Sequence, residues 1–510
     1  MATQQTLPPV TLPPPTPPNS APTPVALKLE NIQGDILSGL PKKTETLYFF
    51  QITDAVKFRE DLKKIIPLVK SVAQVLKDRE EIEKHKRGHG LHGFRSILIP
   101  LVGVNISFSH FGFKKLGIDD TKLVDTAFLN GQRFEAGANL GDKGTGSGQD
   151  FVPDWEEPFK KEIHGVIILA GDSHASVDKK LQEIKLIFDV GGRTSSIAEI
   201  TSVQGDARPG DQSAHEHFGY LDGVSNPAII GFDTNPPPGP APIRAGAIIL
   251  GQDGDNSISE RAPWMVDGSF LVFRYLFQKV PEFDDFVFRN RLKGPGMSDK
   301  EGADLLGARL IGRWKSGAMT QNSELIRKGK KLVESLNIPW LTLPPCRNNN
   351  FHFSAERNFQ KLCPFAAHIR KTLPRADLES LGLGISLETT RIMRRGIQFG
   401  PEVTKTEKLA KKTFHGRGLI FACYQSSIIS GFQFLQSGRI NNATFPFAEN
   451  TPEVPGVDPI LGQGEDRKLS GTDPNNPAAE LNLDDEWVIP RGGEYFFSPS
   501  IQGLTNTIAA

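Results

Sequence analysis

The feature that most constrains the fold of this chain is an order of strand-like and helix-like segments that is used twice. Residues 46–52 are aromatic and β-branched, which is typical of a strand. A helix with a break at Pro67 is expected next, because apolar residues recur there at helical steps. These residues are Phe58, Leu62, Ile65, Val69, Val72 and Leu76. The set is completed by strands at 96–108, 164–171 and 197–203 and a helix at 177–188. This order is the ferredoxin-like plan.

The second half of the chain repeats this order with longer insertions. Its expected elements are strands at 269–277, 417–425 and 493–499 and helices that begin near Pro281 and around 427–436. A chain of 510 residues is also too long for one ordinary core. We therefore predict an α+β protein of two ferredoxin-like domains, each an antiparallel sheet with peripheral helices. The predicted bounds are a Pro-rich, disordered tail at 1–24, an N-terminal domain at 25–240 and a C-terminal domain at 241–510, which carries the pocket.

Charge and hydropathy exclude several classes of function. Lys and Arg together number 59, as do Asp and Glu, so the net charge is close to zero and nothing favours a nucleic-acid partner. No apolar run is long enough to span a membrane. The three cysteines are too few for a disulfide framework. The N-terminus lacks the basic start and apolar stretch of a secretory signal, which favours a cytoplasmic location. A secreted protein with an added start methionine would look the same, so secretion stays open.

One carboxylate stands out in the stretch HEHFGYLDGVSNP at 215–227. Asp222 lies between Gly219 and Gly223, which allow a sharp turn and a close approach to a ligand. An acid held on such a turn could transfer protons if its pKa suits the task. An Asp-Gly pair is also a common surface turn, so the stretch alone leaves both interpretations open.

A histidine in the stretch CPFAAHIRKTLPR at 363–375 has surroundings that suit a haem ligand. His368 follows a small apolar run, which could form the wall behind a haem-ligating imidazole. The cations after it could pair with the haem propionates: Arg370, Lys371 and Arg375. A core histidine that is hydrogen-bonded to the backbone would fit the same residues.

Two further stretches could contribute to a pocket. In RIMRRG, a strand would point Arg394 and Arg395 to opposite faces, so only one of them can face a cavity. An arginine in that place can stabilise developing negative charge, although a basic surface cluster fits equally well. In LIFACYQSS, Leu419 and Phe421 share one face of the predicted strand and could line a cavity or pack in the core.

These four stretches occur together and in chain order, and in that combination the sequence resembles the dye-decolourising peroxidase family. GYLDG resembles the G-x-x-D-G signature of the family, CPFAAHIRKTLPR its haem-ligand region and IMRRG its distal arginine region. The stretches NIQGDIL (31–37), GRW (312–314) and VDPILGQ (457–463) are also similar to family sequences. The resemblance runs from about residue 25 to the C-terminus, with insertions like those of the longer fungal members.

The resemblance implies a role for each matched residue. His368 would be the proximal ligand of the iron in haem b, and Asp458 would hydrogen-bond the far nitrogen of its imidazole. Asp222 would be the distal acid–base residue, and Arg394 would be the distal arginine. The residues implied to line the distal side and control access of peroxide are Leu419 and Phe421.

The activity implied by the resemblance is that of a haem peroxidase. Hydrogen peroxide would be reduced to water while small aromatic donors, phenols or dyes, are oxidised in one-electron steps. An Asp in place of a distal His favours acid pH, because a carboxylate with a pKa near 4 is still a base where imidazole is protonated. Neither a membrane nor a nucleic acid is expected as a partner, and both a monomer and a homodimer stay open.

Two other functions stay open on the sequence. A haem-binding or haem-handling protein with little peroxidase activity would keep His368 but would not need Asp222 and Arg394 together. A zinc hydrolase would use His215 and His217, although no third ligand follows at a recognisable spacing.

Two positions depart from the fungal members that the chain resembles. Several of these are thought to oxidise bulky dyes through an exposed tryptophan, and this chain has Arg439 at that position. Phe399 stands where a tyrosine is expected shortly after the distal arginine. Arginine and phenylalanine are poor radical relays, so we expect small phenols and small dyes to be better donors than bulky anthraquinones.

Overall fold

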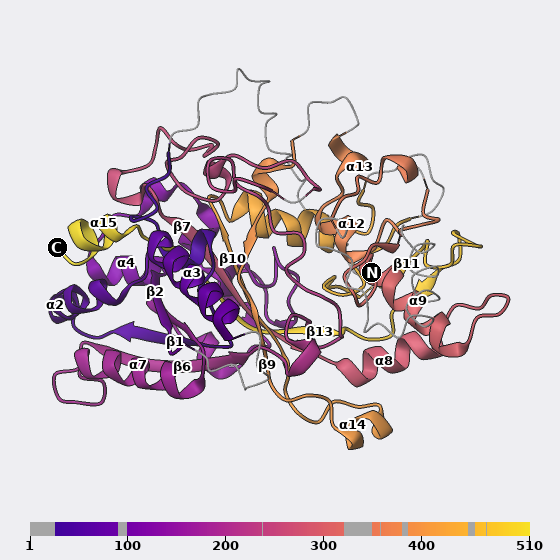
Figure 1. The fold of residues 1–510 in the computed structure, drawn as a ribbon, viewed down its shortest axis with the longest axis horizontal. Helices are drawn as coiled ribbons and strands as arrows, with labels where there is room; N and C mark the ends of the chain where they lie inside the picture. Colours follow the sequence, from indigo (N-terminus) through magenta and orange to yellow (C-terminus); the bar gives the residue numbers. More distant parts are fainter. Residues whose placement is uncertain are drawn as a thin grey trace.

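The two halves of the chain form two antiparallel sheets with the same strand order (Figure 1). The computed structural model describes residues 26–89, 99–236, 238–320, 349–357, 359–379, 386–446, 454–465 and 467–510. Within these residues the two sheets join into one sheet of nine strands. The α+β, ferredoxin-like fold that the sequence predicts is therefore confirmed.

The N-terminal half contains four long strands and two covering helices. The strands are β1 (Thr44–Ile52), β2 (Val102–Phe108), β5 (Gly165–Gly171) and β6 (Ile197–Asp206). They lie in the order β6-β1-β5-β2, and every neighbouring pair is antiparallel. The helices are α2 (Ala55–Ile65), which follows β1, and α7 (His174–Ile187), which follows β5. The chain breaks at Pro67 as predicted, in the 3-10 turn η1 (Ile66–Leu68), before α3 (Val72–His89) begins.

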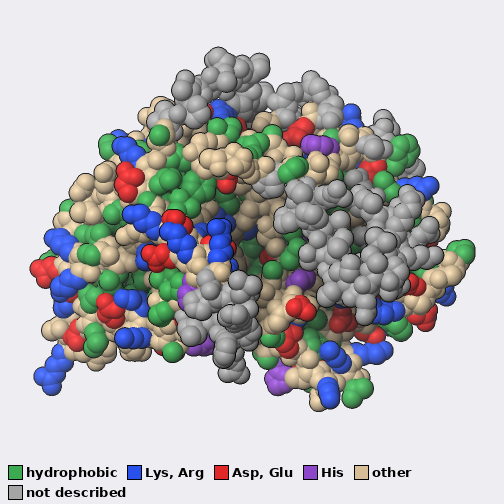
Figure 2. Space-filling view, viewed as in Figure 1, with side chains coloured by type: hydrophobic (Ala, Val, Ile, Leu, Met, Phe, Trp, Pro, Cys, Tyr) green, Lys and Arg blue, Asp and Glu red, His purple; other side chains and the backbone are tan. Residues whose placement is uncertain are grey.

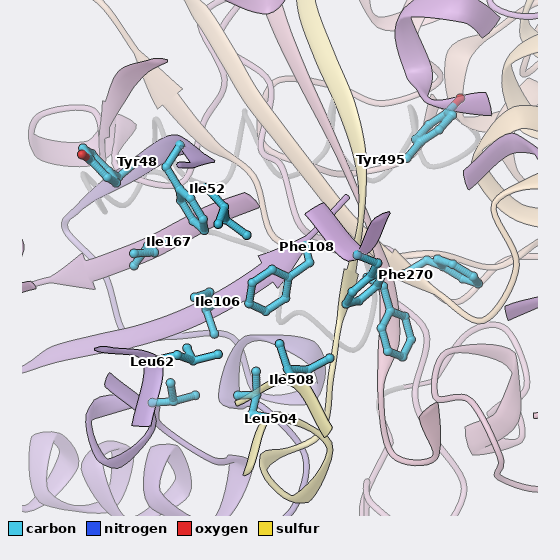
Figure 3. Close-up of a cluster of buried hydrophobic side chains, with 14 of the residues drawn as sticks. Tyr48, Ile52, Leu62, Ile106, Phe108, Ile167, Phe270, Tyr495, Leu504 and Ile508 are labelled. Atoms are coloured by element: carbon cyan, nitrogen blue, oxygen red, sulfur yellow. The ribbon is translucent and has the colours of Figure 1, made fainter. Parts of the chain in front are cut away.

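The strands β1, β2 and β5 are almost wholly buried, whereas β6 at the edge has exposed residues. In β1 and β5, successive side chains alternate between two hydrophobic clusters on opposite faces of the sheet. Tyr48, Phe50 and Ile52 pack in the cluster that contains the apolar faces of α2 and α7. The residues between them, Leu47 and Phe49, belong to the cluster on the opposite face. Figure 3 shows that the first cluster also receives side chains from the second half of the chain, such as Phe270 and Tyr495.

The C-terminal half repeats the strand order, with two short strands in place of one long strand beside β10. Its strands are β7 (Ser269–Gln278), β8 (Met393–Arg394), β9 (Ile397–Phe399), β10 (Gly418–Gln425) and β13 (Val488–Ser498). They lie in the order β13-β7-β10, and β10 pairs with both β8 and β9. Helix α8 (Val280–Arg289) follows β7. After β10, where a helix was predicted, the chain forms two π-helical segments, η11 (Ile429–Gln433) and η12 (Leu435–Ile440). Such segments are frequent at functional sites.

The halves meet where β2 pairs with β13, at Phe108 and Phe497. The bounds at 25–240 and 241–510 stay predictions. The predicted tail at 1–24 lies outside the described residues, as do residues 96–98 of the predicted strand.

Further helices and strands connect these elements. The helices among them are α1 (Gly34–Leu37), α4 (His110–Leu116), α5 (Thr126–Asn130), α6 (Gln132–Glu135), α9 (Asp299–Ile311), α12 (His368–Thr372), α13 (Ala376–Glu379), α14 (Lys405–Ala410) and α15 (Ile501–Gly503). The strands among them are β3 (Gly144–Thr145), β4 (Val152–Pro153), β11 (Lys468–Leu469) and β12 (Leu481–Asn482). None of the helices in the described part of the chain is both long and apolar enough to cross a membrane. Figure 2 shows basic and acidic side chains interspersed on one face, which agrees with the balanced charge.

Candidate active site

A large cavity, here called the central cavity, lies against the C-terminal half of the sheet. Its empty volume is about 1740 Å³, counted out to where it opens to solvent. The apolar part of its lining includes Leu276, Ile369, Ile392, Phe432, Leu435 and Ile460. The stretch 216–225 also lines it, so the GYLDG turn reaches the cavity that the second half of the sheet forms.

His368 lines the cavity and is held from behind by a buried carboxylate. It is the first residue of α12, and its Nδ1 atom lies 2.7 Å from Oδ2 of Asp458. Asp458 is fully buried, and its other oxygen accepts hydrogen bonds from the backbone N–H groups of Ile460 (2.8 Å) and Leu461 (3.0 Å). Burial disfavours a charged imidazole, but the adjacent carboxylate raises the pKa of His368 above its usual value. The Nε2 atom is the ring nitrogen left for a ligand in the cavity.

Asp222 and Arg394 also line the cavity and form an ion pair. Nη1 of Arg394 lies 2.5 Å from Oδ1 of Asp222, and about a third of each side chain is accessible. Gly219 and Gly223 have φ angles of +91° and +76°, so the turn needs residues without a side chain on either side of the acid. Burial acts to raise the pKa of Asp222, but the Arg394 guanidinium and the N–H of Gly223 hold it below its usual value. The turn therefore presents an ionised carboxylate to the cavity.

The backbone of Arg394 is clamped by Asn226, a residue to which the sequence analysis gave no role. Oδ1 of Asn226 accepts from the N–H of Arg394 (3.1 Å), and Nδ2 donates to its carbonyl oxygen (3.2 Å). The clamp joins the GYLDG segment to β8. Arg395 points to the other face, where its Nε atom donates to the carbonyl oxygen of Asp35 (2.8 Å). The prediction that only one of the two arginines faces the pocket is confirmed.

Leu419 and Phe421 line the cavity from one face of β10, as the alternation of the strand predicts. In the sheet they pair with Leu276 and Arg274 of β7, which line the cavity as well. One face of the central strands therefore forms the floor of the cavity.

The prediction for the cations after His368 is wrong in part. Arg370 is fully buried and forms an ion pair with Asp377 at 2.7 Å, and Lys371 donates to the carbonyl oxygen of Asn442 (2.7 Å). Neither of them lines the cavity, whereas Arg375 does. The sequence shows that three cations follow His368. It does not show that Arg370 and Lys371 are already bonded to neighbouring residues.

Arg375 and Arg313 both line the cavity, and both donate to the side chain of Asn349. Oδ1 of Asn349 accepts from Nη2 of Arg375 (2.6 Å) and from Nη2 of Arg313 (3.2 Å), and the Arg375 guanidinium stacks on the ring of Phe351. Burial and the neighbouring guanidinium group lower the pKa of Arg375 to about 8. Arg313 belongs to the GRW stretch, to which the sequence analysis gave no role beyond its similarity to the family. Two adjacent guanidinium groups suit a carboxylate ligand.

The histidines proposed for zinc do not form a metal site. Nε2 of His217 hydrogen-bonds the carbonyl oxygen of Phe399 (2.8 Å), and burial lowers its pKa to about 4. In the described part of the chain, no group of three His, Cys, Asp or Glu residues could hold a metal ion. The structure gives the zinc hydrolase no support.

The two departures from the fungal pattern lie inside the protein. The Arg439 side chain is only 1% exposed, and Phe399 packs against Tyr275 with ring centroids 4.5 Å apart. The side chain at position 439 is therefore not exposed to dyes at the surface of this chain.

Comparison with known proteins identifies the family. The DyP dimeric alpha+beta barrel domain family matches residues 31–209. The dye-decolorizing peroxidase msp1 of Mycetinis scorodonius is 40% identical over 96% of this chain and 89% of its own length. A solved structure of a variant dye-decolorizing peroxidase from Pleurotus ostreatus is 51% identical with a TM-score of 0.87, and the match covers 95% of this chain and 100% of that one. A dye-decolorizing peroxidase solved in complex with 2,6-dimethoxyphenol is 40% identical, with a TM-score of 0.79 and coverage of 95% and 100%.

This chain belongs to the family of DyP-type peroxidases, and its similarity to fungal members extends over nearly all of it. It is an oxidoreductase that acts on hydrogen peroxide. The names of its relatives favour this activity over the haem-handling alternative.

Proposed function

We propose that the central cavity binds haem b and that Nε2 of His368 ligates its iron. The hydrogen bond from Nδ1 of His368 to Asp458 supports this, because it fixes the tautomer and makes Nε2 a better donor to a metal. The apolar lining of the cavity suits a porphyrin ring, and the guanidinium groups of Arg313 and Arg375 suit its carboxylates. Haem b bound there would supply the iron that takes up peroxide and would hold the oxidising equivalents that donors remove.

Asp222 and Arg394 act on hydrogen peroxide in this proposal. The Asp222 carboxylate accepts the proton of one peroxide oxygen and delivers it to the other oxygen, which leaves as water. The Arg394 guanidinium stabilises the negative charge that develops on the leaving oxygen. Over one cycle, one hydrogen peroxide and two donor molecules give two water molecules and two donor radicals, and each donor loses one electron and one proton.

The side chains around the site determine which electron donors can reach it. Leu419 and Phe421 line the cavity together with Arg394, and their bulk would favour peroxide and small aromatic molecules there. The structure of a relative with 2,6-dimethoxyphenol supports small phenols as donors for this chain too. The low pKa of Asp222 keeps its carboxylate ionised in acid, which favours activity at acid pH.

The observation that carries the proposal is the ion pair of Asp222 and Arg394, which shares one cavity with His368. Asp222→Asn keeps the shape of the side chain and removes the proton acceptor. The variant should retain the Soret band, while kcat/KM for peroxide falls about 10²–10⁴-fold. Asp211→Asn is a matched control, because Asp211 is exposed and lies in the same segment. Turnover close to that of the unmodified protein in Asp222→Asn would remove Asp222 from the mechanism.

A further inference from the structure

Glu216, a residue to which the proposed function gives no role, holds the turn that carries Asp222. Its side chain is partly buried and lines the central cavity. Oε2 of Glu216 accepts from the backbone N–H of Phe218 (2.8 Å), and Oε1 accepts from the backbone N–H of Tyr220 (2.9 Å). Both N–H groups belong to the short segment that leads to Asp222. The carboxyl group of Glu216 therefore closes the turn from which the proposed acid projects.

A side chain of β7 joins this carboxyl group to the sheet. Nε2 of Gln278, which also lines the central cavity, donates to Oε2 of Glu216 (2.7 Å). The backbone of Gln278 is fixed as well, because its N–H donates to the carbonyl oxygen of Arg417 (2.8 Å), the residue before β10. The oxygens of Glu216 thus receive hydrogen bonds from both the turn and the sheet. Loss of these acceptors would leave the donors of the turn unsatisfied and would release the turn from β7.

The segment is also anchored to the sheet on both sides of this turn. Nε2 of His217 hydrogen-bonds a carbonyl oxygen of β9 (2.8 Å), and Asn226 clamps the backbone of β8. Between these two anchors, Gly219 and Gly223 allow the backbone to turn but cannot stiffen it, because glycine has no side chain that restricts its backbone angles. The hydrogen bonds to Glu216 stiffen the part of the segment that carries the acid.

We propose that Glu216 is a positioning residue for the reaction with peroxide and that it acts through Asp222. Its carboxyl group fixes the backbone before Asp222, as Asn226 fixes the backbone of Arg394, so that the acid and the guanidinium group keep their contact of 2.5 Å. This inference rests on the proposed function, in which the Asp222 carboxylate takes the proton of peroxide. Glu216 therefore affects the step with peroxide and not the steps with electron donors.

Glu216→Gln tests this role, because an amide has one oxygen where a carboxyl group has two. One of the N–H donors would then face the NH₂ group of the amide, and the turn should loosen. In the haem-loaded enzyme, kcat/KM for peroxide should fall about tenfold, while kcat/KM for guaiacol and the Soret band stay unchanged. Glu282→Gln is the matched control and should leave both constants unchanged. Glu282 is also partly buried and accepts from the N–H of Thr413 (2.8 Å), but it does not line the central cavity.

A double-mutant cycle distinguishes a positioning role from an independent one. If Glu216 acts through Asp222, Glu216→Gln should cause no further loss of kcat/KM for peroxide in the Asp222→Asn variant. An equal loss in both backgrounds would overturn the proposal, because Glu216 would then act on its own. Gln278→Leu keeps the test valid if Glu216→Gln fails to fold. It removes the bond from β7 alone, so kcat/KM for peroxide should fall about threefold, and an unchanged value would overturn the proposal.

Hydrogen–deuterium exchange provides a readout that does not depend on activity. In the full chain without haem, the peptide that contains Phe218 and Tyr220 should exchange about tenfold faster in Glu216→Gln than in the unmodified protein, because their N–H groups lose acceptors. Exchange in β5 should stay the same. Unchanged exchange in the peptide would overturn the proposal. Absence of a Soret band and of guaiacol turnover in the unmodified enzyme would instead contradict the proposed function, and the exchange rates would still show whether Glu216 holds the turn.

Discussion

The two halves of the sheet share a strand order but enclose different interiors. In the N-terminal half, α2 and α7 pack together over the sheet, and the rings of Phe50, Phe58 and Phe188 stack between them. In the C-terminal half, the segment that corresponds to α7 in chain order is η11 and η12, and its Phe432 and Leu435 line the central cavity. One topology thus gives either a filled core or a cavity, depending on the segment that follows its third strand.

Removal of the proposed iron ligand should have the largest effect and should affect only the half with the cavity. His368→Ala is expected to abolish the Soret band and peroxidase activity, because the iron loses its protein ligand. His164 is a buried histidine of the N-terminal half that accepts from the N–H of Ile52 (2.9 Å). His164→Gln should therefore keep the Soret band. Absorption spectra of both variants, purified with added haem, check this. A normal Soret band in His368→Ala would exclude His368 as the ligand.

Large-to-small substitutions should distinguish a filled interior from a cavity. Phe58→Ala in the N-terminal half should lower the free energy of unfolding by about 3–5 kcal/mol, because the void is enclosed. Leu435→Ala should lower it by about 2 kcal/mol, because the new space joins a cavity that already exists. Urea unfolding of each variant measures the difference. Equal losses would show that the two interiors are equally well filled.

Removal of the Asn226 clamp on Arg394 should have a smaller effect on activity, and the effect should be confined to the cavity. Asn226→Ala removes both hydrogen bonds to the Arg394 backbone, so the guanidinium should lose its fixed position. We expect kcat/KM for peroxide to fall about tenfold while the Soret band stays. Asn130→Ala, in the N-terminal half, removes a hydrogen bond to Glu135 and serves as the control. Activity unchanged in Asn226→Ala would show that the sheet alone positions Arg394.

The pH dependence should give the smallest and most specific effect. The pKa of Asp222 lies below its usual value of 3.8, so its carboxylate stays ionised as the pH falls from neutral to about that value. The rate constant for reaction with peroxide should be flat over this range and should fall only at lower pH. Arg394→Gln should move the fall to higher pH, because the cation that lowers the pKa is gone. Stopped-flow measurements between neutral and acid pH give both profiles, and identical profiles would contradict the assigned role of the ion pair.

Local patterns in the sequence predict much of this fold, and the resemblance supplies most of the site. Period-two and helical patterns predict the long strands and α2 with its break at Pro67, because these elements bury regular apolar faces. The alternation of a strand predicts that Arg394 and Arg395 diverge. The resemblance pairs His368 with Asp458, which lie 2.7 Å apart although 90 residues separate them in the chain.

The other features of the site depend on contacts between residues that no local sequence pattern predicts. The clamp of Asn226 on Arg394 spans 168 residues of sequence. Arg370 looks like a free cation until the fold brings it against Asp377. Arg313 and Arg375 are far apart in the sequence, and only the fold brings them together at Asn349.

The central claim is that one imidazole on one side of the cavity, and an acid and a guanidinium on the other, bracket an iron porphyrin. Anomalous X-ray scattering at the iron edge from crystals of the haem-loaded protein tests it most directly. The account predicts a single iron peak bonded to Nε2 of His368, with Asp222 and Arg394 on the opposite side of the porphyrin. An iron bound by another residue, or a porphyrin that leaves Asp222 and Arg394 on the same side as His368, would contradict it.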